Sequence, residues 1–589
     1  MNDLWIAGIS RGHNGSLCLL KNGNIVFSIE EERLSRKKYD GSPFAAMVKI
    51  LEYTDRLDYL VVAHTQSLEE SAGIIDFTGD NMYTGMARKL GLIDRTADAD
   101  SHPQVIDLSG IHHQLHAACA FYRSGFETAT AVVVDGAGTF IPLSDGKSSS
   151  IGFETETIFA CGYPDTFQTK YKHIGLRGPA PASIQNIKDD TGREHAVVIS
   201  DRAGIVKAYE AVTQYCGFSA IEAGKTMGLF PYGKENNNIP PIFEKDAAVT
   251  LVNRNLIIPT YPNAALVNTV VYPELQDEQV DDITELSNRR DLAYAVQTET
   301  QESVLDLINN AVELTGNKNV VLSGGYGLNC VANYYYLNNL DPEINLYVEP
   351  VSNDAGTAIG AAYLIHQSIT QSTTPMPRTD DLYLGPKYNI DDSFLAELIE
   401  KYDAEVIQSD YNSVVEKLQQ KNIVALFQGR SENGPRALGN RSLLFDPTVE
   451  NGKDFVNEVK RREYFRPFAG SILEEDAHEW FDLRGMQSSP TMMYAVNCRE
   501  GVAEKIPAII HVDGTCRIQT VNSEQNPVYY DLISTFKEKT GVPILFNTSF
   551  NLGGEPLVET LDDAFRTLAE SDIEYLYLPE NNCLVYIKN

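Results

Sequence analysis

Apolar segments that end in glycine or aspartate recur along this chain between stretches of helical periodicity, and they constrain its fold more than any other feature. The clearest are TAVVVDG at 130–136, NVVLSGGYGLN at 319–329 and NIVALFQG at 422–429. Strands that alternate with helices predict an α/β fold, in which ligands meet the carboxyl ends of the strands. The first residues instead predict a meander, with a strand at 4–10 and a hairpin about the KNGN turn at 21–24.

The length of 589 residues is enough for two or more domains. The stretch at 368–381 is rich in Ser, Thr and Pro, so we predict a linker there, between one domain at 1–367 and another at 382–589. Residues 141–195 are polar and rich in turns, and they could form an inserted lobe.

The formal net charge of −33 and the pI of about 4.7 argue against a broad surface for duplex DNA or anionic membranes. A small anionic substrate would need a basic pocket of its own. The eight cysteines are scattered and form no C-x-x-C pair, so the sequence indicates neither a disulfide framework nor a zinc ribbon. The first residues lack a signal-peptide pattern and no segment is apolar for long enough to span a bilayer, so we expect a cytoplasmic protein with no membrane partner.

Two histidines at helical spacing indicate a metal site. His112 and His116 are four residues apart, which places both imidazoles on one face of a helix. Asp135 and Asp354 could complete a mixed nitrogen and oxygen shell, which suits Fe²⁺, Mn²⁺ or Zn²⁺ better than Ca²⁺. The same spacing is also compatible with two packing or capping histidines, whereas His113 points off that face.

Three glycine-rich turns indicate phosphate or nucleotide binding in a cleft between two related subdomains. They are SGGYGLN at 323–329, EAGKTMGLFPYG at 222–233 and VSNDAGTAIG at 351–360. Lys225 in the second turn is available to a phosphate, and Asn329 at the end of the first could bond to an adenosine. Glycine turns are also common without any ligand.

The segment 430–466 is locally basic. It holds eight basic and six acidic side chains, a net charge of +2 within a strongly acidic chain. Guanidinium groups bind phosphate oxygens in pairs, and neighbouring glycines expose backbone N–H groups. Arg517 and the NTSFN run at 547–551 add donors that could converge on the same anion, although a solvated basic face is the simpler alternative.

The GHNGS segment at 12–16 carries a histidine beside a glycine at the end of a predicted strand. His13 could act as a general base on an acceptor hydroxyl or hold a carbonyl oxygen. A surface turn histidine explains the residue equally simply.

Taken together, these segments resemble the NodU/CmcH family of O-carbamoyltransferases over nearly the whole chain. The resemblance is carried, in order, by GHNGSLCLLKNG, EEERLSRKK, HHQLHAACAFY, VVVDGAG, AGKTMGLFPYG, LSGGYGLNCVAN, SNDAGTAIGAA, GRSENGPRALGNRSLL, VKRREYFRPFAGSIL, HVDGTCRIQTV and LFNTSFNLGGEPLV. It implies an N-terminal domain of the sugar-kinase/actin ATPase type, with two related subdomains, and a C-terminal YrdC-like α/β domain. Tyr39, Asn433 and Gly470 depart from the family pattern, which puts acceptor contacts and local loop shape in question.

The resemblance also implies roles for individual residues. The metal, iron first with Mg²⁺ or Mn²⁺ as alternatives, would be held by His112, His116, Asp135 and Asp354. The nucleotide would be bound by Lys225, Gly324, Gly325, Asn329 and Asp354. Carbamoyl phosphate would be bound by Arg436, Arg441, Lys460, Arg517, Asn547 and Ser549. The residues implied in catalysis are His13, Lys38, Lys460 and Arg517.

The implied reaction is stepwise. Carbamate released from carbamoyl phosphate attacks the α-phosphate of ATP, and an acceptor hydroxyl then attacks the carbamoyl adenylate. The acceptor would be a small molecule, a sugar or a hydroxymethylated pyrimidine in a nucleotide or in DNA, and residues 141–200 would shape its choice. A non-catalytic nucleotide-binding protein and a tRNA threonylcarbamoylation enzyme are the alternatives, and a homodimer is compatible with the sequence.

Overall fold

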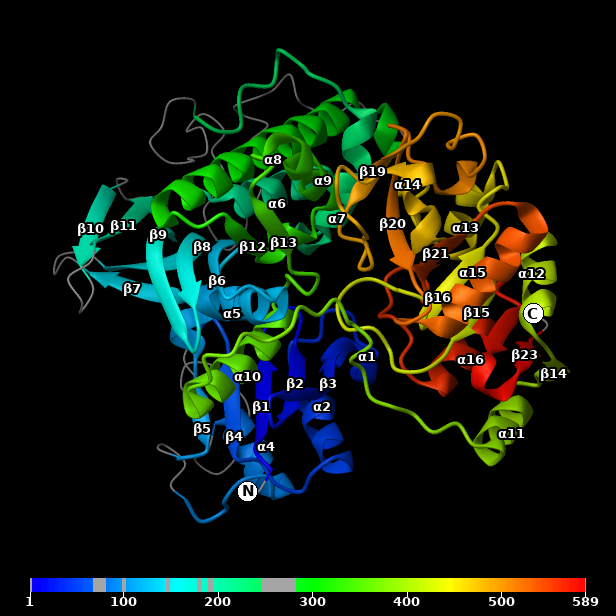
Figure 1. Ribbon diagram of the computed structural model, residues 1–589, viewed down its shortest axis with the longest axis horizontal. Helices are drawn as coiled ribbons and strands as arrows, with labels where there is room; N and C mark the ends of the chain where they lie inside the picture. The colour runs from blue at the N-terminus through cyan, green and yellow to red at the C-terminus, as the bar shows by residue number, and fades with distance from the viewer. Residues whose placement is uncertain are drawn as a thin grey trace. The chain divides into compact units, whose positions relative to one another are not determined.

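The computed structural model describes residues 3–66, 81–97, 102–144, 149–176, 183–188, 194–200, 202–244 and 282–587. Its contacts divide the chain into two compact units (Figure 1). Unit 1 comprises Met1–Val26 and Gly41–Thr379, and unit 2 comprises Phe27–Asp40 and Asp380–Asn589. The division after Thr379 falls within the predicted linker, but residues 27–40 group with the C-terminal unit, where the sequence had placed them in the first domain.

The first sheet of unit 1 has the strand order β3-β2-β1-β4-β5. Strand β1 pairs antiparallel with β2 and parallel with β4, and β4 pairs parallel with β5. The hairpin between β2 and β3 turns at Asn22 and Gly23, whose φ angles of 52° and 82° are those of the Asn-Gly turn that the sequence predicted. The predicted meander is therefore confirmed. The strands are β1 (Trp5–Ser10), β2 (Ser16–Lys21), β3 (Asn24–Glu30), β4 (Tyr59–Ala63) and β5 (Val105–Asp107).

The second sheet of unit 1 repeats this arrangement in the five strands β9-β8-β6-β12-β13, which end at the edge strand β13. Strand β6 pairs antiparallel with β8 and parallel with β12, and β12 pairs parallel with β13. The duplicated topology confirms two related subdomains of the sugar-kinase/actin type. These strands are β6 (Thr128–Val134), β8 (Ser149–Gly162), β9 (Thr166–Leu176), β12 (Asn319–Ser323) and β13 (Asn345–Val348).

The tract at 141–195, which the sequence left unassigned, is largely β-structure. Strands β7 (Phe140–Ser144), β10 (Ser183–Lys188) and β11 (Glu194–Ser200) enlarge the second sheet beyond the repeat. Residues 145–148, 177–182 and 189–193 lie outside the described residues, so the expectation of an acceptor-shaping segment at 141–200 rests in part on residues without a described structure.

Helices α5 (His112–Ser124) and α10 (Ala355–Thr370) pack against each other between the two sheets (Figure 1). A side chain at Gly360 would place its Cβ 2.0 Å from the carbonyl oxygen of Leu115, and one at Gly8 would approach Ala358 O to 2.1 Å. The small residues of α10 therefore allow the close packing that the sequence predicted. The other described α-helices of unit 1 are α2 (Phe44–Lys49), α4 (Met82–Leu90), α6 (Ile205–Tyr215), α7 (Ala223–Leu229), α8 (Ser287–Thr315) and α9 (Cys330–Asn339).

Unit 2 is built on a mixed sheet with the order β14-β23-β22-β15-β16-β21-β17-β20-β19-β18. This confirms a second α/β unit, while its YrdC-like character stays a prediction. The strands are β14 (Glu405–Gln408), β15 (Val424–Phe427), β16 (Arg441–Phe445), β17 (Ala469–Leu473), β18 (Phe481–Asp482), β19 (Ala495–Cys498), β20 (Thr515–Val521), β21 (Ile544–Ser549), β22 (Tyr575–Leu578) and β23 (Cys583–Tyr586). The helices are α1 (Glu31–Ser35), α11 (Asp392–Lys401), α12 (Tyr411–Gln419), α13 (Gly452–Val459), α14 (Ala477–Trp480), α15 (Pro527–Thr540) and α16 (Leu561–Ala569).

Residues 27–40 are anchored in unit 2 by hydrogen bonds from buried or half-buried groups. Ser28 N donates to Leu384 O at 2.7 Å, and Arg33 Nη2 donates to Gly434 O at 2.6 Å. Arg36 donates to the carbonyls of residues 556 and 557.

Among the helices of the described part of the chain, none combines the length and the apolar character needed to cross a membrane.

Candidate functional site

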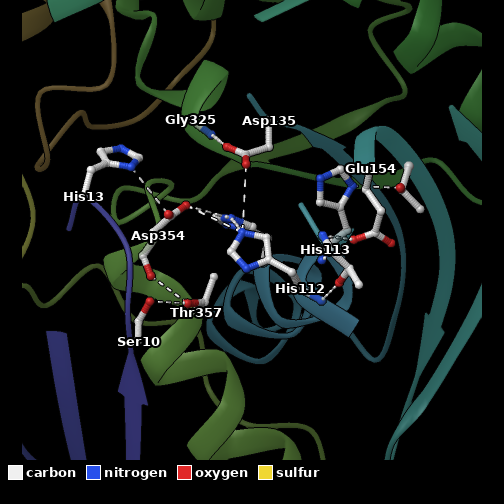
Figure 2. A network of polar contacts seen from close by, with 12 residues as sticks. Ser10, His13, His112, His113, Asp135, Glu154, Gly325, Asp354 and Thr357 are labelled. Atoms are coloured by element: carbon white, nitrogen blue, oxygen red, sulfur yellow. Dashed lines mark hydrogen bonds and ion pairs between the residues drawn. The ribbon is translucent and has the colours of Figure 1, made fainter. Parts of the chain in front are cut away.

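The four predicted metal ligands come together in unit 1 (Figure 2). His112 and His116 lie on the first turns of α5, Asp135 follows β6, and Asp354 precedes α10. The two Nε2 atoms are 3.2 Å apart, and each is 3.6 Å from Asp354 Oδ1. One ligand atom from each of the four residues lies within 4.8 Å of the others.

This donor set fits a divalent metal. Burial lowers the pKa of His112, but the hydrogen bond and negative charge of Asp354 outweigh burial and raise it. Burial alone would raise the pKa of Asp354, yet its hydrogen bonds with His112 and His116 hold it well below its usual value. Two imidazole nitrogens and two carboxylates therefore face one point in a buried site, which suits Fe²⁺, Mn²⁺ or Zn²⁺. The identity of a metal stays a prediction.

A surrounding layer of polar contacts fixes the start of α5. Thr139 Oγ1 accepts from His112 N at 3.0 Å, and Glu154 Oε2 accepts from Thr139 N at 3.0 Å. His113 turns away from the cluster and bonds through Nδ1 to Thr157 Oγ1 at 2.8 Å, and its burial lowers its pKa to about 4. The sequence did not indicate these partners, because they lie just before β7 and on β8, beyond the end of α5 in the chain.

The glycine turn after β12 reaches the same cluster. Gly325 N donates to Asp135 Oδ1 at 2.8 Å, and Gly324 adopts a φ of +88° against the carbonyl of Val134. Asn329 instead caps α9, since its Oδ1 accepts from Ala332 N at 3.1 Å. Gly324 and Gly325 are therefore at the cluster, whereas the contacts of Asn329 are those of a helix cap.

The further predicted site residues His13, Lys225 and Lys38 do not all lie at the metal-type cluster. His13 Nδ1 lies 3.6 Å from Asp354 Oδ2, and 49% of its side chain is exposed, which places it at the rim of the cluster (Figure 2). Lys225 pairs with Glu222 at 2.8 Å. Lys38 belongs to unit 2, where its ammonium pairs with Glu32 at 2.7 Å.

Unit 2 gathers most of the predicted carbamoyl phosphate ligands on one face of its sheet. In the strand register, Asn547 lies opposite Ala469, and Ala469 lies opposite Arg517, so Asn547 and Arg517 share a face. Asn547 Nδ2 also donates to Ala437 O at 3.2 Å, which brings the loop that carries Arg436 to that face.

Lys460 is buried beside this face at the end of α13. Its ammonium donates to the carbonyl of Ser549 and, at 2.8 Å, to the carbonyl of Asn551. Burial lowers the pKa of Lys460 well below its usual value, and the charges of Arg462 and Arg466 lower it further.

The pKa of Arg462 is also well below its usual value, first through burial and then through the charges of Arg466, Arg517 and Arg436. Lys460 and Arg462 therefore each lie near further cations, an arrangement that suits a phosphate site. Arg462 and Arg466 lie in the basic segment that the sequence singled out, but they were not among its candidate ligands.

Arg441 differs from the other predicted anion ligands. It is fully buried, and its guanidinium stacks on the Phe427 ring at 3.6 Å. It makes hydrogen bonds to the backbone carbonyls of Gln428, Gly429, Asn440 and Glu559. These contacts hold the surrounding loops together, and direct phosphate binding by Arg441 stays a prediction.

The chain thus combines a duplicated α/β unit that holds a buried metal-type cluster with a second α/β unit that holds a cluster of cations. Comparison with known protein families identifies the family of this chain. The family "Carbamoyltransferase N-terminus" matches residues 59–363, and "Carbamoyltransferase C-terminus" matches residues 415–585. The chain belongs to the carbamoyltransferase family and is an enzyme that transfers carbamoyl groups.

Two relatives and one solved structure illustrate what this chain is similar to. The nodulation protein NolNO of Sinorhizobium fredii is 30% identical over 96% of this chain and 78% of its own length. The 3'-hydroxymethylcephem-O-carbamoyltransferase of Streptomyces clavuligerus is 30% identical over 59% of this chain and 61% of its own length. Full-length HypF in its phosphate- and nucleotide-bound form shares 14% identity over 63% of this chain and 56% of its own, with a TM-score of 0.35.

Proposed function

We propose that this carbamoyltransferase takes its carbamoyl group from carbamoyl phosphate, activates it with ATP as carbamoyl adenylate, and passes it to an acceptor hydroxyl. The observation that carries the proposal is the presence of two chemically distinct buried sites in one chain. A cation cluster suits the cleavage of a phosphate compound, and a cluster of His and Asp beside a glycine turn suits a nucleotide with its metal.

The first step belongs to unit 2. Water adds to the carbonyl carbon of carbamoyl phosphate, the bond from that carbon to the phosphate oxygen breaks, and carbamate and inorganic phosphate result. Lys460, Arg436 and Arg517 offset the charge on the departing phosphate, while Asn547 and Ser549 orient the substrate.

The second step belongs to unit 1. A carbamate oxygen attacks the α-phosphorus of ATP and pyrophosphate leaves, which gives carbamoyl adenylate. The backbone at Gly324 and Gly325 admits the nucleotide close to the end of β6. A divalent metal held by the four clustered side chains would supply positive charge to the phosphates.

In the last step the acceptor oxygen attacks the carbamoyl carbon and AMP leaves. His13 is placed to take the hydroxyl proton, because its half-exposed imidazole is oriented by the carboxylate of Asp354. The name of one relative, the 3'-hydroxymethylcephem-O-carbamoyltransferase, favours a small molecule with a free hydroxyl as the acceptor. A hydroxymethylated pyrimidine is the second candidate, although the net charge of −33 weighs against extended contact with duplex DNA.

The acceptor is tested by mass spectrometry of products after incubation with carbamoyl phosphate, ATP and Fe²⁺ or Mg²⁺. The acceptor panel should contain sugars, hydroxymethyl-bearing small molecules, and hydroxymethylated pyrimidines as nucleotides and in DNA. A carbamoylated member of the panel names the acceptor class. Carbamoyl phosphate that survives unchanged in every mixture would contradict the proposed reaction.

A further inference from the structure

A buried ion pair on α6 lies outside every set of site residues named above. Lys207 Nζ contacts Glu210 Oε2 at 2.6 Å, one helical turn apart. Only 8% of the lysine side chain and 16% of the glutamate side chain are exposed. Withdrawing two charges from water is costly, so such a pair is weak evidence for stability and a reason to ask what it faces.

The pair faces the turn that carries one of the clustered aspartates. A Cβ built on Gly136 would lie 2.7 Å from Glu210 Oε1 and 3.6 Å from Lys207 Nζ. Gly136 directly follows Asp135, whose carboxylate points toward His112 and lies 3.9 Å from its Nε2 (Figure 2). The pair therefore lies at the carboxyl end of β6, the part of a sheet where ligands bind.

The start of α6 is held firmly in this position. Ile205 N donates to the buried carboxylate of Glu156 at 2.7 Å, and a side chain at Gly204 would collide with Thr155. Burial raises the pKa of Glu210, and the negative charge of Asp135 adds to that effect while Lys207 opposes it. The pKa of Glu210 therefore depends on the charge of Asp135, on the other side of the Gly136 turn.

Charge balance indicates what the lysine is for. A divalent metal would neutralise the two aspartates of the cluster, so the phosphates of a nucleotide would need further positive charge. A lysine ammonium supplies it as a point charge beside the phosphates. Lys225, which the sequence indicated for this purpose, pairs with Glu222 where both side chains are partly exposed.

We propose that Lys207 is a phosphate-binding residue of the nucleotide site and that Glu210 is the positioning residue that holds its ammonium toward the Asp135–Gly136 turn. This inference rests on the proposed function, since it requires a nucleotide beside the cluster. It adds a cation from α6 to a site otherwise built from α5, α10 and two strand ends.

The test uses the full-length protein and a non-hydrolysable ATP analogue, with binding measured by calorimetry in the presence of Mg²⁺. Lys207→Met should weaken binding of the analogue roughly 10- to 100-fold, the range of a hydrogen bond to a charged group, and Lys207→Arg should restore part of it. Lys49→Met is the matched control, because Lys49 also pairs with a glutamate three residues on, at 2.8 Å. Thermal unfolding midpoints of all three variants should match that of the wild type, which shows that unit 1 is folded, and phosphate release from carbamoyl phosphate, the reaction proposed for unit 2, should persist.

Glu210→Gln should raise the KM for ATP more than it lowers kcat, and the double variant should bind the analogue no more weakly than Lys207→Met alone. Unchanged binding in Lys207→Met, or a larger loss in Lys225→Met, overturns the inference. Binding by the wild type without carbamoyl adenylate formation defeats the proposed reaction and leaves the phosphate role of Lys207 standing. A wild type that binds no nucleotide overturns both.

Discussion

Replacing Lys460 with Met removes one charge from the cation cluster of unit 2 and nearly preserves the side-chain volume. The wild-type ammonium is buried and donates to the carbonyls of Ser549 and Asn551. The proposed reaction places it against the phosphate that leaves carbamoyl phosphate. The substitution therefore separates the chemical role of the charge from the packing of the side chain.

The expected loss of activity follows from the burial of the site. Removing one preorganised donor from a water-excluded site typically costs about 2.7–4 kcal/mol, or roughly 10²- to 10³-fold in rate. The effect on stability should be smaller, because the lost hydrogen bonds to two carbonyls are offset by removing a desolvated charge that Arg462 and Arg466 repel.

The assay is phosphate release from carbamoyl phosphate, paired with binding of an ATP analogue to the same protein. Lys537→Met is the control, because Lys537, on α15, forms a partly exposed ion pair with Asp476 at 2.8 Å. Lys460→Met should lose phosphate release and keep analogue binding, while the control should keep both. Near-wild-type phosphate release in Lys460→Met, or equal loss of both properties, would refute the assignment of separate sites.

Three further predictions concern unit 1. His116→Ala should lose bound metal, measured by elemental mass spectrometry, and carbamoyl adenylate formation, while phosphate release persists; full metal content in the variant would count against the cluster. Gly360→Val should lower the free energy of unfolding by about 2–3 kcal/mol in urea titrations, because its Cβ would meet a backbone oxygen of α5 at 2.0 Å, and an unchanged midpoint would contradict this packing. Burial alone would raise the pKa of Glu156, but the charge of His173 outweighs burial and holds the pKa below the ordinary 4.5. The unfolded chain therefore binds this proton more tightly than the folded protein does, so the free energy of unfolding should fall as the pH drops below 4.5. Glu156→Gln should lose less stability over the same acid range.

Local patterns in the sequence predicted the metal-type cluster well. The spacing of His112 and His116 sets one helix face, and Asp135 stands where an apolar strand ends, so both features follow from short-range geometry. The duplicated subdomains and the packing of α10 were likewise predictable, because they depend on strand order and on small residues at regular spacing.

The features that the sequence did not predict depend on contacts between distant segments. Residues 27–40 begin within β3, whose first residues belong to unit 1, yet Arg33 bonds to Gly434 in unit 2. Asn329 was predicted as a nucleotide ligand because it ends a glycine turn, and that role stays a prediction; the sequence did not indicate that its side chain also caps the helix that starts there. No sequence motif marks Lys207. Its proposed phosphate role follows from its position beside Gly136, which lies many residues earlier in the chain.

The most direct test of the two-step account is mass spectrometry of the nucleotides formed from carbamoyl phosphate, ATP and Fe²⁺ in the absence of any acceptor. The account predicts carbamoyl adenylate together with pyrophosphate, and their formation should require both carbamoyl phosphate and ATP. Formation of ADP in place of AMP derivatives, or transfer of carbamoyl to an acceptor without ATP, would contradict it.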